Sequence, residues 1–169
     1  MYIDQTKEEA KMADYNERTR TNRFHVTNED RYQELFGRLK GNEDGIKDLT
    51  ITDEDGRLFH GFGSASTVDY YPEPNCANCK YAEGCGKTED DKEECEAADF
   101  DEFVSEMQKI LPEDETMIII TSGYEKLRYL TGGALVISRT ETAWKDINDW
   151  AIEKAKEMVG KDYETSTSY

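Results

Sequence analysis

Four cysteines are the residues whose spacing most directly suggests chemistry. Cys76 and Cys79 are separated by two residues, and Cys85 and Cys95 follow in the same short stretch. A C-x2-C pair lets two thiolates bind one ion from a single turn, and four thiolates close a tetrahedral zinc site with no open position. The sequence therefore predicts one structural zinc bound by all four cysteines. An iron–sulfur cluster, free thiols and disulfides remain alternatives.

The two histidines of the chain, His25 and His60, are further candidates. Each falls in a segment with strand character, so pairing of the two strands would bring both imidazoles together beside a carboxylate. A histidine on a strand is more often structural than catalytic. The spacing of cysteines and histidines selects no thiol nucleophile, and the glycines lack the flanking pattern of a phosphate-binding loop. The sequence thus names no catalytic residue.

A dense run of carboxylates follows the cysteines, and two adjacent tyrosines precede them. If the run is helical, its charges are spread over several turns and can imitate nucleic-acid phosphates before a basic groove; a solvated acidic loop is the alternative. Exposed tyrosine rings beside carboxylates supply rigid contact area for a protein partner, unless they cap the core. The predicted partner-binding residues are Glu89, Asp90, Asp91, Glu93, Glu94, Glu96, Asp99, Asp101, Glu102, Tyr70 and Tyr71.

The charge balance of the whole chain narrows the class of partner. Among 169 residues, 38 are acidic and 21 basic, which gives a formal net charge of -17. This charge repels nucleic-acid backbones and anionic lipid, and it attracts a basic protein surface. We therefore expect a basic protein partner, with no direct binding to nucleic acid or membrane. No stretch approaches the roughly 20 apolar residues that span a bilayer, and residues 1–22 lack a secretory signal, so we expect a cytoplasmic protein.

Hydrophobic periodicity predicts the elements that position these residues. Helices are expected at residues 28–40, 99–111 and 142–159, the last with a core-packed face that includes Trp144 and Trp150. Asp55 and Gly56 mark a hairpin turn between two strands. Strands are expected at residues 23–26, 49–52, 57–62, 117–120, 127–130 and 134–137, with 117–120 buried on both faces and a flexible link at 131–133.

These elements follow no strict βαβ alternation. The sequence therefore predicts an α+β fold with a mixed or antiparallel sheet of about five strands and about three helices. The length fits a single domain. We expect a flexible arm at residues 1–21, one domain at 22–160 with an acidic cysteine-containing insertion at 72–98, and a disordered tail at 161–169.

In size, charge and tyrosine content the chain resembles small acidic inhibitors made by bacteriophages and mobile elements, of the anti-CRISPR or anti-restriction type. Residues 89–102 carry this likeness, and residues 124–133 (YEKLRYLTGG) resemble uncharacterised proteins of such elements. The resemblance implies a non-enzymatic inhibitor of a basic nucleic-acid-handling protein such as a Cas effector. The alternatives are an antitoxin or immunity protein, and a small regulator or enzyme stabilised by a metal that the four cysteines bind.

Overall fold

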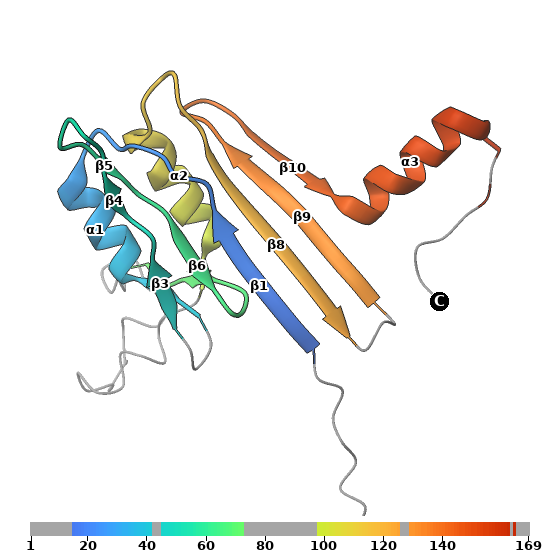
Figure 1. The fold of residues 1–169 in the computed structure, drawn as a ribbon, viewed down its shortest axis with the longest axis horizontal. Coiled ribbons are helices and arrows are strands. Elements are labelled where there is room, and N and C mark those ends of the chain that lie inside the picture. The colour runs from blue at the N-terminus through green and yellow to red at the C-terminus, as the bar shows by residue number, and fades with distance from the viewer. Residues whose placement is uncertain (1–14, 42–44, 73–97, 126–128, 163, 165–169) are drawn as a thin grey trace, which may run out of the picture.

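The structure is a computed structural model that describes residues 15–41, 45–72, 98–125, 129–162 and 164. Its centre is a six-stranded sheet in the order β10-β9-β8-β1-β6-β3 (Figure 1), and neighbouring strands run antiparallel. The α+β class with an antiparallel sheet is therefore confirmed. The strands of this sheet are β1 (Tyr15–Thr21), β3 (Ile46–Asp48), β6 (Phe62–Ser64), β8 (Met117–Glu125), β9 (Tyr129–Ile137) and β10 (Thr142–Asp146).

Two short strand pairs extend this framework. β2 (Leu39–Lys40) pairs with β7 (Asp69–Tyr70), and β4 (Ile51–Thr52) pairs with β5 (Leu58–Phe59). The β4–β5 turn forms because the Asp53 carboxylate accepts hydrogen bonds from the backbone N–H groups of Asp55 and Arg57. Gly56 adopts a φ of 81°, which favours glycine. The hairpin predicted at Asp55 and Gly56 is thus confirmed.

Each of the three described helices begins at a side chain that accepts backbone N–H groups, and these caps fix where the helices start. The helices are α1 (Glu29–Gly37), α2 (Phe100–Ile110) and α3 (Ile147–Val159), capped by Asn28, Asp99 and Asp146 respectively. Helices α1 and α2 cover one face of the sheet and form the core with it. The largest fully buried side chains include Tyr32, Leu35, Phe62, Phe103, Met107 and Met117.

The ladder register separates the two faces of the sheet. Residues that pair directly across strands share a face, so Thr19 lies with Ser64, and Arg20 lies with Gly63 and Ile120. Thr19 and Ser64 are buried on the side of α1 and α2, whereas Ile120 is 54% exposed. The prediction that residues 117–120 are buried on both faces is therefore wrong. We call the uncovered side the open face.

The N-terminal prediction is also wrong in part. Residues 15–21 form β1, which lies between β6 and β8 inside the sheet, rather than belonging to a flexible arm. The strand escaped prediction because its buried residues, Thr19 and Thr21, are small and polar. Thr19 Oγ1 donates to Ser66 O at 2.8 Å and Thr21 Oγ1 donates to Phe62 O at 3.3 Å, so these threonines are buried through hydrogen bonds instead of an apolar stripe. Residues 1–14 lie outside the described part.

The C-terminal third differs most from expectation. The segment predicted as one core-packed helix is strand β10 followed by α3, and Trp144 lies on the strand with 56% of its surface exposed. None of the side chains of α3 is buried. The predicted flexible link at residues 131–133 lies inside the continuous strand β9.

The predicted helix at 99–111 is confirmed as α2, whereas the one at 28–40 ends at Gly37. The predicted strand at 23–26 is reduced to a bridge between Phe24 and His60.

Candidate functional site

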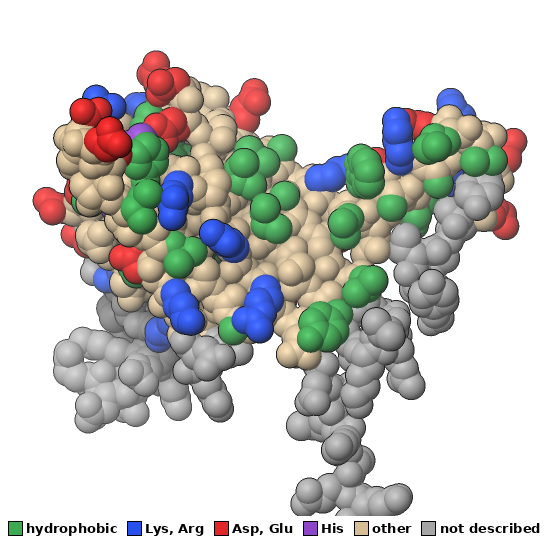
Figure 2. Space-filling view, viewed as in Figure 1, with side chains coloured by type: hydrophobic (Ala, Val, Ile, Leu, Met, Phe, Trp, Pro, Cys, Tyr) green, Lys and Arg blue, Asp and Glu red, His purple; other side chains and the backbone are tan. Residues whose placement is uncertain are grey.

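The open face gathers cations in a strongly acidic chain. The register places Lys47, Arg20 and Lys145 in one row across the sheet, with Arg18 one row away, and all four side chains are exposed. Figure 2 shows blue groups across this face of the sheet, with red carboxylates at the rim near α1 and the β4–β5 hairpin. Among the described strand residues that the register places on this face, none is a carboxylate.

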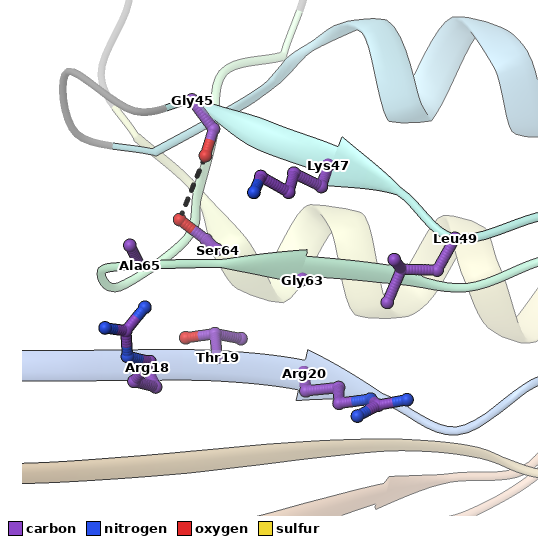
Figure 3. A pocket seen from close by; sticks show the side chains of 9 residues that line it. All are labelled: Arg18, Thr19, Arg20, Gly45, Lys47, Leu49, Gly63, Ser64 and Ala65. Atoms are coloured by element: carbon purple, nitrogen blue, oxygen red, sulfur yellow. Dashed lines mark hydrogen bonds between the residues drawn. The ribbon is translucent and has the colours of Figure 1, made fainter.

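Three of these cations line one cleft of about 530 Å³. Lys47 extends from β3, while Arg18 and Arg20 extend from β1, on the two sides of Gly63 (Figure 3). Gly63 has no side chain to cover the floor between them. Within the described residues the structure shows no ion pair for any of the three cations. Guanidinium and ammonium groups arranged in this way suit carboxylate or phosphate oxygens. We call Arg18, Arg20 and Lys47 the cationic cleft.

An apolar hollow of about 450 Å³ lies on the same face, between the sheet and the start of α3. Ile120 and Leu130 of the sheet and Ile147 and Trp150 of α3 line it. Gly132 makes the close approach possible, because a Cβ at this position would lie 3.3 Å from Ile147 Cγ2. The hollow and the cationic cleft were not predicted. Both depend on which strands become neighbours, and local sequence periodicity does not contain that information.

The helical side carries part of the predicted partner-binding surface. Asp99 caps α2 by accepting the N–H of Glu102 at 3.0 Å, and Asp101 and Glu102 are exposed in its first turn. On α1, Asp30 is exposed as well. The predicted residues Glu89, Asp90, Asp91, Glu93, Glu94 and Glu96 lie outside the described residues.

Tyr70 requires a correction, because it is not available as a surface contact. Its side chain is 2% exposed and packs against Phe103, with ring centroids 5.4 Å apart. The strand pair β2–β7 turns this ring toward α2. Tyr71 is half-buried, and the Lys40 ammonium lies 4.6 Å from the centre of its ring. Tyr70 is therefore a core residue, and Tyr71 alone of the two reaches the surface.

The two histidines each pair with a glutamate. The backbones of Phe24 and His60 exchange both hydrogen bonds, which brings the predicted segments together. His60 is fully buried, with Nε2 at 2.7 Å from Glu29 Oε2 and Nδ1 at 3.3 Å from Thr50 Oγ1. His25 bonds the Glu115 carboxylate through its Nδ1 and through its backbone N–H, the latter at 2.8 Å.

This arrangement favours a structural role for both imidazoles. A cleft of about 520 Å³ opens beside His25, Glu29, Asp114 and Glu115. However, Nε2 of His25 is buried, and no described residue forms a hydrogen bond with it, so it does not face the cleft as an acid or base would. Both nitrogens of His60 are engaged by neighbours. The His60–Glu29 pair connects the β4–β5 region to the start of α1, and the His25–Glu115 pair connects the chain before α1 to the loop that follows α2.

The four cysteines predicted to bind zinc lie outside the part of the chain that the structure describes. Among the described residues, no three or more His, Cys, Asp or Glu side chains converge as a metal site requires. Cys76, Cys79, Cys85 and Cys95 all lie at residues 73–97, outside the described part, so the zinc prediction stays a prediction. Within the same described ranges, the helices are too short or too polar to span a bilayer.

Comparison with known proteins gives no relative from which a role can be transferred. Neither the family models, nor the curated proteins, nor the solved structures contain a match to this chain.

Proposed function

We propose that this protein is a non-enzymatic binding protein that uses its acidic helical side to engage a basic surface of a nucleic-acid-handling protein, as an inhibitor of the anti-CRISPR or anti-restriction type would. The observation that carries this proposal is the segregation of charge. Asp30, Asp101 and Glu102 are exposed on the helical layer, where the exposed Lys109 is paired with Glu106. The exposed cations of the six-stranded sheet lie on the opposite, open face.

The helical layer carries its exposed carboxylates at both of its ends. The Thr27 N–H donates to Ile110 O, so α1 begins where α2 ends, and the two helices run antiparallel. Asp30 therefore lies toward one end of the layer, and Asp101 and Glu102 lie toward the other. In the sequence, the acidic run predicted at residues 89–96 leads directly into the start of α2, where Asp101 and Glu102 lie. Such an extended array steers a basic partner over a distance of about one Debye length, roughly 8–10 Å in physiological salt.

The experiment measures affinity for a panel of purified basic proteins: Cas effectors, restriction enzymes and basic toxins. The test variant combines Asp30→Lys, Asp101→Lys and Glu102→Lys. The matched control combines Glu141→Lys, Asp162→Lys and Glu164→Lys, exposed positions away from α1 and α2 that give the same change in net charge. We expect the test variant to lose about tenfold or more in affinity, because each rim charge contributes on the order of 0.5 kcal/mol. We expect the control to retain binding.

The two outcomes of this comparison separate local recognition from general charge. Equal weakening by both variants would show that only net charge matters and would reject the acidic helical side as the binding surface. Absence of binding to every basic protein at low salt would reject the proposed function itself. Binding to a basic toxin alone would replace the inhibitor assignment with an immunity role.

A further inference from the structure

Helix α3 leaves much of its apolar surface exposed in a single copy. Ile147, Trp150 and Met158 are 56%, 52% and 78% exposed, and no side chain of the helix is buried. Figure 1 shows α3 projecting beyond β10, away from the rest of the fold. At 100° per residue, about half of its circumference is apolar, as in helices that pack against a partner. The apolar residues of this half are Ile147, Trp150, Ala151, Ile152, Ala155, Met158 and Val159, and Lys154 lies among them.

The open face of the sheet is the second uncovered apolar surface. Ile120, Tyr124 and Leu130 are 54%, 50% and 63% exposed, and the register places all three on this face. An antiparallel sheet often leaves one face in water, but that face is then lined by polar residues. Large apolar side chains here indicate a surface that is covered in the working state of the protein. A helix packed on this side would complete a layered arrangement.

The charges at the edges of the two surfaces are complementary. Asp149, Glu153 and Glu157 recur at i, i+4 spacing and form an acidic stripe beside the apolar half of α3. The cationic cleft lies beside the apolar part of the open face. Glu153 bonds Lys145, and Glu157 bonds Lys154 at 2.6 Å, but exposed pairs of this kind contribute about 1 kcal/mol or less and can exchange partners.

The start of α3 is fixed in a direction that keeps it from reaching the cationic cleft of its own chain. Asp146 caps the helix, Asn148 Nδ2 donates to Leu130 O at 2.9 Å, and Ile147 lies against Gly132. β1, which carries Arg18 and Arg20, is separated from β10 by β9 and β8, a distance of roughly 14 Å at normal strand spacing. Within one chain α3 therefore leads away from the cationic cleft, although its first turn lines the apolar hollow and Glu153 pairs with Lys145.

We propose that two copies of the protein form a dimer in which α3 of each copy lies across the open face of the other, with its acidic stripe over the cationic cleft. The contact is reciprocal, so every matched surface is used twice. The apolar side chains involved, at on the order of 100 Å² each, approach the roughly 800 Å² per partner that specific interfaces bury. The helical layer lies on the opposite face, so the exposed carboxylates Asp30, Asp101 and Glu102 point away from the interface.

The first test determines the mass of the full chain in solution by light scattering, at protein concentrations up to about 100 µM. We expect a dimer for the wild type and for Ile51→Glu, a control at a 40% exposed apolar residue on β4. We expect a monomer for Trp150→Glu, with an unchanged circular dichroism spectrum. A monomeric wild type at every concentration, or a dimer that survives Trp150→Glu, would overturn the proposal.

A charge exchange identifies which surfaces meet. One variant carries Arg18→Glu and Arg20→Glu, and the other carries Asp149→Lys and Glu153→Lys. Each variant alone places like charges in both contacts, so its dimer should weaken by about tenfold or more. A mixture of the two has one native contact and one contact with both charges reversed, so native mass spectrometry should detect the mixed dimer. Failure to form it, while each variant alone still dimerises, would show that the interface lies elsewhere.

Discussion

At the scale of single residues, the ordered positions of the two histidines come from carboxylates contributed by distant segments. Burial raises the pKa of Glu115, but the backbone N–H and the imidazole of His25 lower it by more, so the pKa lies below its ordinary value. The charged form of Glu115 is therefore more favourable in the folded protein than in the unfolded chain. This carboxylate ties the loop after α2 to the segment before α1.

The lowered pKa of Glu115 predicts how acid affects stability. At neutral pH, Glu115→Gln should lower the free energy of unfolding by about 1–2 kcal/mol, as expected for a hydrogen bond to a charged group. A carboxylate with a lowered folded-state pKa stabilises the fold above its unfolded pKa of 4.5 and ceases to do so as pH falls through the folded value. The difference between wild type and variant should therefore shrink from pH 4.5 downward.

Urea unfolding of both proteins between pH 7 and pH 3 measures this difference. Glu113→Gln is the matched control, because Glu113 is exposed in the same loop, and it should change stability by less than about 0.5 kcal/mol. A constant difference for Glu115→Gln across the whole range would show that the amide disturbs packing instead of removing a charge.

At the scale of elements, β9 and β10 are held together by an aromatic ring over a glycine. Register pairs Trp144 with Leu135, and the ring reaches diagonally to Gly133. A Cβ at Gly133 would lie 2.5 Å from two carbons of that ring. The glycine that suggested a flexible link in the sequence thus makes room for an indole, and the ring compensates for the missing side chain in the strand.

Gly133→Ala should displace the Trp144 ring and lower the free energy of unfolding by about 1 kcal/mol, the lower end for overpacking because the ring is half exposed. Tryptophan fluorescence in a Trp150→Phe background reports the ring, and urea unfolding reports stability. Gly37→Ala at the end of α1 is the control: outside the backbone of the helix, no described atom lies within 4 Å of a Cβ there, so it should stabilise the protein by roughly 0.4–1 kcal/mol. Unchanged fluorescence in Gly133→Ala would contradict the packing.

How far these elements follow from the sequence depends on whether their signal is local. Helix α2 combines a cap, Asp99, with an apolar stripe that includes Phe103 and Met107, and its predicted bounds differ from the structure by one residue at each end. The hairpin turn at Gly56 is equally local. By contrast, β1 lacks an apolar stripe, and residues 142–159 have apolar residues at helical spacing across both a strand and a helix. These segments become strands because β1 pairs with β8 and β10 pairs with β9, and these pairings are not visible in the local sequence.

The candidate surfaces required more than periodicity. The sequence indicates that the chain is acidic, but Arg18, Arg20 and Lys47 come from two strands separated in sequence and meet only because β6 lies between β1 and β3. The sequence predicts Tyr70 as a surface contact beside the acidic run, whereas the β2–β7 pairing turns it toward Phe103. Alternation of strand residues predicts which side chains share a face, but not which face is covered.

At the scale of the whole molecule, the two layers carry different charge and therefore suit different contacts. The acidic helical layer is the surface proposed for a basic partner, and the open face with α3 is the surface proposed for a second copy. Because the two surfaces lie on opposite sides of the sheet, a dimer would leave both acidic layers accessible. Rejection of one proposal would leave the other intact, because Asp101→Lys changes the helical layer and Trp150→Glu changes α3.

Removal of α3 tests whether the protein is a folded body with an attached arm. A chain that ends at Asp146 keeps every residue of the core cluster, because that cluster contains no residue of α3. We expect its urea unfolding midpoint to match that of the full chain at low protein concentration and to stay constant as concentration rises. The midpoint of the full chain should instead rise with concentration, because dimerisation stabilises only the folded state. Loss of cooperative unfolding in the shortened chain would show that α3 belongs to the fold of a single copy.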